Sequence, residues 1–129
     1  MKEVYVSFDV AKLLKEKGFD WECHHFYYCK NNGKIVEKWI QFIADRNSDR
    51  WINPYAEYVS APTQQMACDW LRDKQIDILP DCSLVDRKYS FHIINRYKTG
   101  GEIIHSDEIY DKYEDAIEAA LEYCLTKLI

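Results

Sequence analysis

The chain has 129 residues, with 17 Lys+Arg against 22 Asp+Glu and a formal net charge of −5. Apolar residues make up 47% and aromatic residues 15%, with only 4 Gly and 3 Pro. This composition excludes disordered, collagen-like and low-complexity chains, and it predicts a single globular domain over residues 1–129.

Several common classes of protein have no signature in the sequence. No apolar run approaches the roughly 18 residues that span a membrane, and Glu3 and Asp9 interrupt any signal-peptide core. Glycine-rich nucleotide loops and the HExxH, CxxC and GxSxG motifs are absent. With 5 cysteines and no secretion signal, we expect reduced thiols and a cytoplasmic protein.

The first predicted element is a helix that begins after Ser7 and ends before Gly18. Ser7 is a favourable N-cap, Asp9 places a negative charge in the first turn, and glycine favours a helix end. The expected buried face consists of Val10, Ala11 and Leu14.

A hairpin is predicted next, from residues 23–29 and 34–44. Asn32-Gly33 between the two strands is typical of a type I′ turn, which needs a positive φ at both positions. The second strand carries apolar residues in both of its alternating rows, so we expect it to be partly covered on both sides. These apolar residues are Ile35, Val36, Trp39, Ile40, Phe42 and Ile43.

Residues 45–59 combine Asn, Ser, Asp and Pro without a clear period, which predicts a long loop. Its Arg50, Trp51, Tyr55 and Tyr58 are of the residue types that dominate protein-interface hot spots. Long loops in small domains are often functional. We therefore expect these four residues to bind a protein partner; the alternative is that the loop folds its aromatic side chains onto the core as a lid.

The second half of the chain predicts a helix, short strands and a final helix. The helix begins near Pro62 or Thr63, and a short strand over residues 76–81 is stopped by Pro80. Residues 87–98 alternate in polarity, a Thr-Gly-Gly turn follows, and residues 102–105 run back. The final helix is expected from about Asp111 to Leu128, with acidic residues on its solvent side.

These elements predict an α+β fold with a mostly antiparallel sheet, about three helices and the order α-ββ-α-(β)-ββ-α. An offset of 68 aligns residues 30–36 with residues 98–104, and an offset of 50 aligns the two helices that follow. The chain is thus a candidate for two ββα units, the first with an inserted loop. The alternative is that any two hairpin-helix units share turn and stripe residues.

Cysteine and histidine chemistry is weakly indicated. Cys23, His24, His25 and Cys29 lie within seven residues, but a straight strand separates the two cysteines by about 20 Å. One strand therefore cannot close a tetrahedral zinc site, and we predict no metal ligand. Cys68 and Cys124 lie on or beside apolar stripes, where cysteine is normally inert, so we predict no catalytic residue and no cofactor. The alternative is a Cys-His pair in which a basic neighbour activates the thiol as a nucleophile.

A second candidate surface combines basic and aromatic residues near the two hairpins. Such patches bind nucleic acid by phosphate neutralisation and base stacking, although the net charge of −5 opposes it. The alternative interpretation is solvated lysines beside turns. The residues concerned are Lys30, Lys34, Lys38, Trp39, Arg96 and Lys98.

Three segments carry a resemblance: residues 6–19 (VSFDVAKLLKEKGF), 60–73 (SAPTQQMACDWLRD) and 113–129 (YEDAIEAALEYCLTKLI). Together they resemble a group of small proteins of no established activity, encoded in prophages and other mobile elements of gut bacteria such as Bacteroidetes. The resemblance implies a cytoplasmic bacterial setting and an accessory role in phage or plasmid replication. It implies no catalytic or binding residue.

The sequence thus favours a non-enzymatic accessory protein that binds a protein partner through the loop Arg50 to Tyr58 and the adjoining hairpin ends. The first alternative is a nucleic-acid accessory protein that uses the hairpin patch. The second alternative is an enzyme of unrecognised class.

Overall fold

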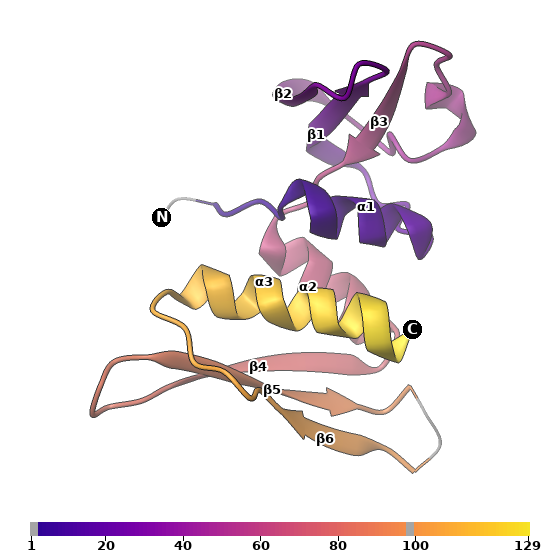
Figure 1. Ribbon diagram of the computed structural model, residues 1–129. Coiled ribbons are helices and arrows are strands. Elements are labelled where there is room, and N and C mark those ends of the chain that lie inside the picture. The colour runs from indigo at the N-terminus through magenta and orange to yellow at the C-terminus, as the bar shows by residue number, and fades with distance from the viewer. Residues whose placement is uncertain (1–2, 98–99) are drawn as a thin grey trace. The chain divides into compact units, whose positions relative to one another are not determined.

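The computed structural model describes residues 3–97 and 100–129 (Figure 1). It contains three helices and two three-stranded antiparallel sheets in the order α-βββ-α-βββ-α, which confirms the predicted α+β class. The strands form two separate sheets rather than one. The chain divides into two compact units, residues 1–63 and 64–129.

The first unit contains one α-helix and a sheet with the strand order β2-β1-β3. Its elements are α1 (Phe8–Glu16), β1 (Cys23–Lys30), β2 (Ile35–Ala44), the short 3-10 helix η1 (Asp49–Trp51) and β3 (Ala56–Ser60). The cap of α1 is as predicted: the Ser7 side chain accepts a hydrogen bond from the Val10 N–H at 3.2 Å. Gly18 ends the helix with a φ of 91°.

Helix α1 and the segment before it cover one face of the first sheet. The Tyr27 hydroxyl donates to the Val6 carbonyl at 2.8 Å, and the Phe8 ring meets the Tyr27 ring edge-on at 5.5 Å. Val10 and Leu14 of α1 are fully buried. Burial of these apolar side chains stabilises the helix on the sheet, as its amphipathic pattern predicted.

Three predictions for the first unit are wrong in detail. The end of the expected loop is a strand, β3, which pairs antiparallel with β1 from Phe26–Ser60 to Lys30–Ala56. The hairpin turn is not type I′, because Gly33 has a φ of 87° whereas Asn32 has no positive φ. The Gly33 N–H donates to the Lys30 carbonyl, as in the longer hairpin loops that end on a left-handed glycine.

The third wrong prediction concerns strand β2, which is largely exposed rather than partly covered on both sides. β2 lies at the edge of the sheet and has only β1 as a neighbour. Cys23 pairs with Ala44 and His25 with Trp39, so residues 40–43 lie opposite His24 alone and form a bulge. Because of the bulge, the apolar residues among positions 40–43 have no cross-strand partner in a regular register.

The second unit has two helices on one face of a sheet with the strand order β4-β5-β6 (Figure 1). Its elements are α2 (Gln64–Asp73), β4 (Ile76–Cys82), β5 (Tyr89–Asn95), β6 (Glu102–His105) and α3 (Tyr113–Tyr123), which continues as a turn of π-helix (Cys124–Leu128). The alternation predicted for β5 is confirmed, because Phe91 and Ile93 are buried. Pro80 lies inside β4 and does not end it, which an edge strand tolerates.

The core of the second unit is apolar and continuous. Trp70 and Leu71 of α2 are buried, as are Ala116, Ile117, Ala120 and Leu121 of α3. The Gln64 side chain joins the two helices by donating to the Glu114 carbonyl at 2.9 Å. In the described part of the chain, no helix is long and apolar enough to cross a bilayer.

The chain forms the strands of the two sheets in a different order. The offset of 68 aligns the hairpin β1–β2 with the hairpin β5–β6. In each sheet, the first strand of this hairpin is central and the second lies at an edge. The third strand follows the hairpin in the first unit and precedes it in the second. Duplication of a ββα unit therefore stays a prediction.

Candidate functional site

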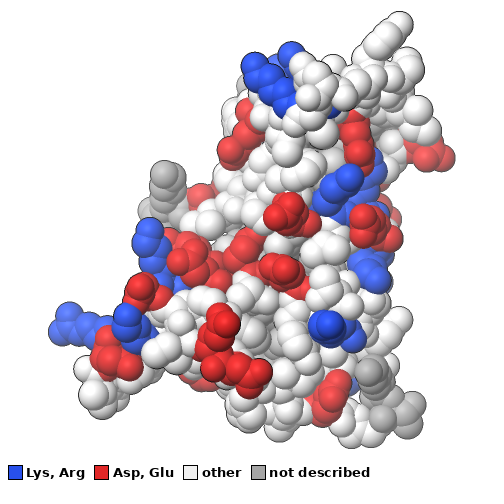
Figure 2. All heavy atoms as spheres, viewed as in Figure 1, with Lys and Arg blue, Asp and Glu red and all other residues white. Residues whose placement is uncertain are grey.

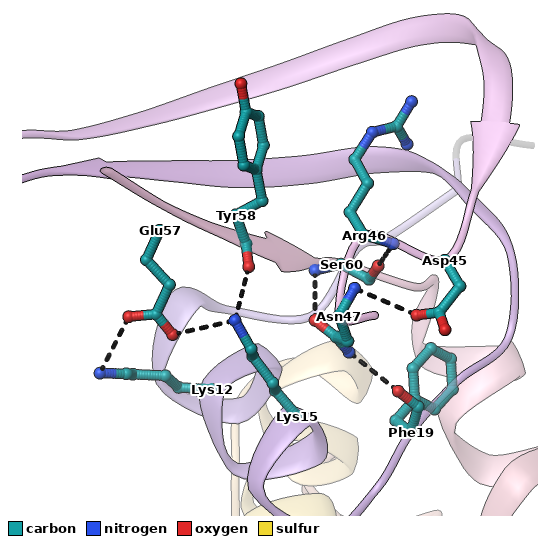
Figure 3. A network of polar contacts seen from close by, with 9 residues as sticks. All are labelled: Lys12, Lys15, Phe19, Asp45, Arg46, Asn47, Glu57, Tyr58 and Ser60. Atoms are coloured by element: carbon teal, nitrogen blue, oxygen red, sulfur yellow. Dashed lines mark hydrogen bonds and ion pairs between the residues drawn. The ribbon is translucent and has the colours of Figure 1, made fainter. Parts of the chain in front are cut away.

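The segment between β2 and β3 is held at its base by hydrogen bonds (Figure 3). The Asn47 side chain donates to the Phe19 carbonyl at 2.9 Å and accepts from the Ser60 N–H at 3.0 Å. The Arg46 N–H donates to the Ser60 hydroxyl oxygen at 2.9 Å. These contacts fix both ends of the segment, so residues 46–60 form an ordered lobe rather than a free loop.

Lysine side chains of α1 hold the lobe on its β3 side. The Lys15 ammonium donates to the Tyr58 carbonyl at 2.9 Å and to the Glu57 carboxylate at 3.2 Å. Lys12 lies 3.8 Å from the same carboxylate. Figure 3 shows Glu57 turned toward these lysines and the Tyr58 ring turned to the other side of β3. The alternation of the strand thus separates the acidic side chain from the aromatic one.

Arg46 is a buried cation that pairs with carbonyl oxygens and aromatic rings. Its side chain is 1% exposed, and its two terminal nitrogens donate to the carbonyls of Cys23 and Phe42, each at 2.8 Å. The guanidinium carbon lies 4.3 Å from the Phe26 ring centre and 5.1 Å from that of Trp51. Burial lowers the pKa of Arg46 from its usual value. Arg46 therefore joins the bulge of β2 to β1 and to the lobe.

The four residues predicted to bind a partner lie in two kinds of environment. Trp51 is half-buried, and its ring meets that of Tyr58 at 5.3 Å, so both side chains pack on the sheet as the lid alternative described. Arg50 is exposed, and Tyr55 is 76% exposed at the tip of the lobe. The lobe thus presents part of the predicted set to solvent and uses the rest to pack.

A depression of about 730 Å³ lies where the lobe meets the bulge of β2. Arg50 and Trp51 of the lobe line it together with Phe42 and Ile43 of β2. Phe42 is 67% exposed, although it belongs to a residue type that is usually buried. We call this feature the lobe depression.

The rim of the lobe depression is acidic. Asp20, Glu22 and Asp45 contribute to its lining. Burial raises the pKa of the Asp45 carboxyl from its usual value, and the negative charges of Asp20 and Glu22 raise it further. The lobe depression therefore combines apolar walls with a concentration of negative charge, which favours a basic partner.

A second depression, of about 500 Å³, lies on the face of the first sheet opposite α1. Register places its residues together, because Tyr28 pairs with Val36 and with Tyr58, and Phe26 pairs with Lys38. Lys30 completes the lining. We call this feature the sheet groove. Its side chains are three aromatic rings, one valine and two lysines, without a carboxylate among them.

The residues predicted to contact nucleic acid are only partly brought together. Lys30 and Lys38 line the sheet groove, whereas Lys34 lies in the hairpin turn. Trp39 pairs with His25, so it belongs to the opposite face, and its ring stacks on His24 at 5.2 Å. Arg96 lies in the second unit and pairs with Asp77. Lys98 lies outside the described residues.

Burial changes the acidity of two cysteines and of His25. Among the described residues, no group of three or more His, Cys, Asp or Glu is placed to hold a metal ion. Burial raises the pKa of Cys124 to about 12 and that of Cys68 to about 11, so both thiols resist ionisation. The Nε2 atom of His25 lies 2.7 Å from Glu37, and burial lowers the pKa of His25.

Sequence reasoning missed the aromatic and apolar residues that complete the two depressions. Phe42 and Ile43 were assigned to a partly covered strand, and the bulge that exposes them has no sequence signature. Phe26 could have been found from the alternation of β1, which places it on the face of Tyr28 and separates it from His25 and Tyr27. Tyr58, the cross-strand partner of Tyr28, was assigned to a loop.

Comparisons with known proteins add no relative. No family model matches the chain, and neither a curated protein nor a solved structure is similar to it.

Proposed function

We propose that this chain is a non-enzymatic binding protein that holds a protein partner at the lobe depression. The observation that carries the proposal is the exposure of apolar side chains of β2 in the lining of that depression. Phe42 is 67% exposed and Ile43 is 44% exposed. Exposed apolar patches of this kind mark protein interaction surfaces.

The charge of the lobe depression specifies the chemistry of the partner. Three acidic side chains, Asp20, Glu22 and Asp45, line the depression with one basic side chain, Arg50, and the chain as a whole carries a charge of −5. A partner that inserts an apolar side chain flanked by lysine or arginine would satisfy both features. The acidic rim would then accelerate and orient the encounter, and the buried apolar contact would supply most of the affinity.

The order of the lobe supports the same function. Asn47 and Arg46 fix the base of the lobe, and Lys15 holds its β3 side. Binding at the lobe therefore requires little ordering of the backbone. Preorganisation of this kind saves conformational entropy on association. The accessory role implied by the resemblance to mobile-element proteins is part of this proposal, since such a protein acts by binding a component of its host or of the element.

Phe42→Asp tests the proposal more directly than Trp51→Ala does. Trp51 packs on Tyr58 and on Arg46, so its loss would also destabilise the unit. The Phe42 side chain is mostly exposed, and its carbonyl, which Arg46 binds, is retained in the variant. Leu84→Asp is the matched control, because Leu84 is 97% exposed in the second unit.

The experiment is affinity capture from a nuclease-treated bacterial lysate with the wild type, Phe42→Asp, Leu84→Asp and the pair Asp20→Asn with Glu22→Gln. We expect a protein captured by the wild type and by Leu84→Asp, lost with Phe42→Asp and weakened by the neutralised rim. Capture of the same proteins by all four chains, or of none by the wild type, would overturn the proposal. Circular dichroism of each variant checks that the fold is retained.

A further inference from the structure

We propose that the sheet groove binds single-stranded nucleic acid. This inference is independent of the lobe depression, since the sheet groove has its own lining. Tyr28 and Tyr58 supply partly exposed aromatic rings beside the buried Phe26, and Lys30 and Lys38 supply positive charge. Stacking platforms combined with a basic groove are the general means by which proteins hold unpaired bases and their phosphates.

The aromatic geometry suits stacking. The Tyr28 and Tyr58 rings meet at 5.0 Å with an interplanar angle of 61°, so the edge of one faces the other. Both side chains are half-buried, which fixes their orientation and leaves part of each ring accessible. Because a base in a duplex is already stacked on its neighbours, only an unpaired base can use these rings.

The charges of the groove are segregated from the acids of the same unit. Within the described residues, Lys30, Lys34 and Lys38 form no ion pair, so their charges remain available for phosphates. The nearest acidic neighbours along the strands are turned away. Glu37 reaches His25 on the opposite face, and Glu57 reaches the lysines of α1.

Figure 2 shows a local group of basic side chains on the first unit. Lys and Arg side chains gather at the end of that unit drawn at the top of the view, and acidic and further basic side chains lie below them. A local positive patch on a chain of charge −5 can still bind phosphates, because screening limits electrostatic interactions to about 8 to 10 Å at physiological salt. The overall charge is then a weaker objection than the composition alone suggested.

The test is fluorescence polarisation of a labelled oligonucleotide of about 12 thymidines titrated with the full chain. With Lys30 and Lys38 on the phosphates, the logarithm of the affinity should fall against the logarithm of salt with a slope of about −1.4 between about 50 and about 200 mM. Lys38→Gln should weaken binding and make the slope shallower by about 0.7. Lys127→Gln, the same change at an exposed site in the second unit, should alter neither.

An aromatic variant and the Phe42→Asp chain complete the experiment. Tyr28→Leu keeps an apolar side chain but removes a stacking surface, and it should weaken binding about tenfold. Phe42→Asp should leave oligonucleotide binding unchanged, so failure of this inference is distinguishable from failure of the proposed protein-binding function. Absence of binding at low salt, insensitivity to Lys38→Gln, or equal affinity for a duplex of the same length would each overturn the inference.

Discussion

The two sheets of this protein contain three antiparallel strands each, yet different interactions stabilise them. The second sheet is covered by two helices, α2 and α3, whose buried residues are almost all apolar. The first sheet is covered by the single helix α1, and its connecting lobe is held by Asn47, Arg46 and Lys15. Burial of apolar side chains needs no particular partner, whereas the hydrogen bonds that hold the lobe depend on individual donors and acceptors.

This difference has a consequence for function. In the second unit, the apolar side chains of α2 and α3 are buried against the sheet, so few of them are available to bind a partner. In the first unit, polar contacts hold the backbone while aromatic and apolar side chains stay at the surface, in the lobe depression and the sheet groove. Both proposed binding surfaces therefore lie in the unit that the sequence described less well.

Thiol reactivity gives the largest expected contrast. Cys124 lies in the second unit's core, and burial raises the pKa of its thiol from 9.0 to about 12. At neutral pH its thiolate fraction is therefore about a thousandth of that of a thiol with a pKa of 9.0. We expect iodoacetamide to label the exposed Cys82 about a thousandfold faster in the folded chain, as followed by mass spectrometry. Labelling of both residues at similar rates would mean that the core around α3 is open.

Removal of apolar volume from the second unit comes next. Leu121 is fully buried on α3, and Leu121→Ala should lower the free energy of unfolding by about 2 to 5 kcal/mol. Urea denaturation measures the change. Leu84→Ala, at an almost fully exposed position, should change the free energy by less than about 0.5 kcal/mol. Equal effects of the two substitutions would contradict the assignment of the core.

Removal of a polar anchor from the first unit should cost less. Asn47→Ala deletes one donor and one acceptor and leaves the buried Ser60 N–H without its partner, a loss of about 1 to 3 kcal/mol. Asn53→Ala is the matched control, since the Asn53 side chain accepts a hydrogen bond from the exposed Tyr55 N–H. If the two variants unfold at the same urea concentration, the anchor contributes nothing beyond an exposed turn.

The smallest expected effect is a pH dependence centred on His25. Burial lowers its pKa below the usual 6.5, and the adjacent Glu37 opposes that shift. Below 6.5 the unfolded chain binds a proton that the folded chain excludes, so this contribution to stability is present at higher pH and is lost as pH falls. We expect His25→Gln to lose less stability than the wild type between about pH 7.5 and about pH 5.5. Parallel pH profiles for the two chains would contradict this assignment.

The elements that the sequence predicted correctly are those whose pattern reflects apolar burial. The stripes of the three helices and the alternation of β5 follow directly from the faces they bury. Strand β3 was missed because Pro54 and Asn53 precede it closely and because its pairing with β1 joins residues about thirty positions apart. Long-range pairing of a short segment leaves no local pattern.

The candidate site was predictable only in part, for the same reason. The hot-spot composition of the lobe identified Arg50, Trp51, Tyr55 and Tyr58, but not which of them would pack inward. Their partners on β2 depend on the bulge opposite His24, and the buried Arg46 depends on two carbonyls from distant strands. Neither feature follows from residue types or their spacing.

Residue-resolved hydrogen exchange of the wild type and Asn47→Ala under native conditions tests most directly whether the two units are stabilised separately. We expect the variant to lose protection in the amides of β3 and the lobe, while those of β5 keep theirs. Equal loss of protection in both sheets would contradict it, and would show that one cooperative core, rather than a polar anchor in the first unit, holds the binding surfaces in place.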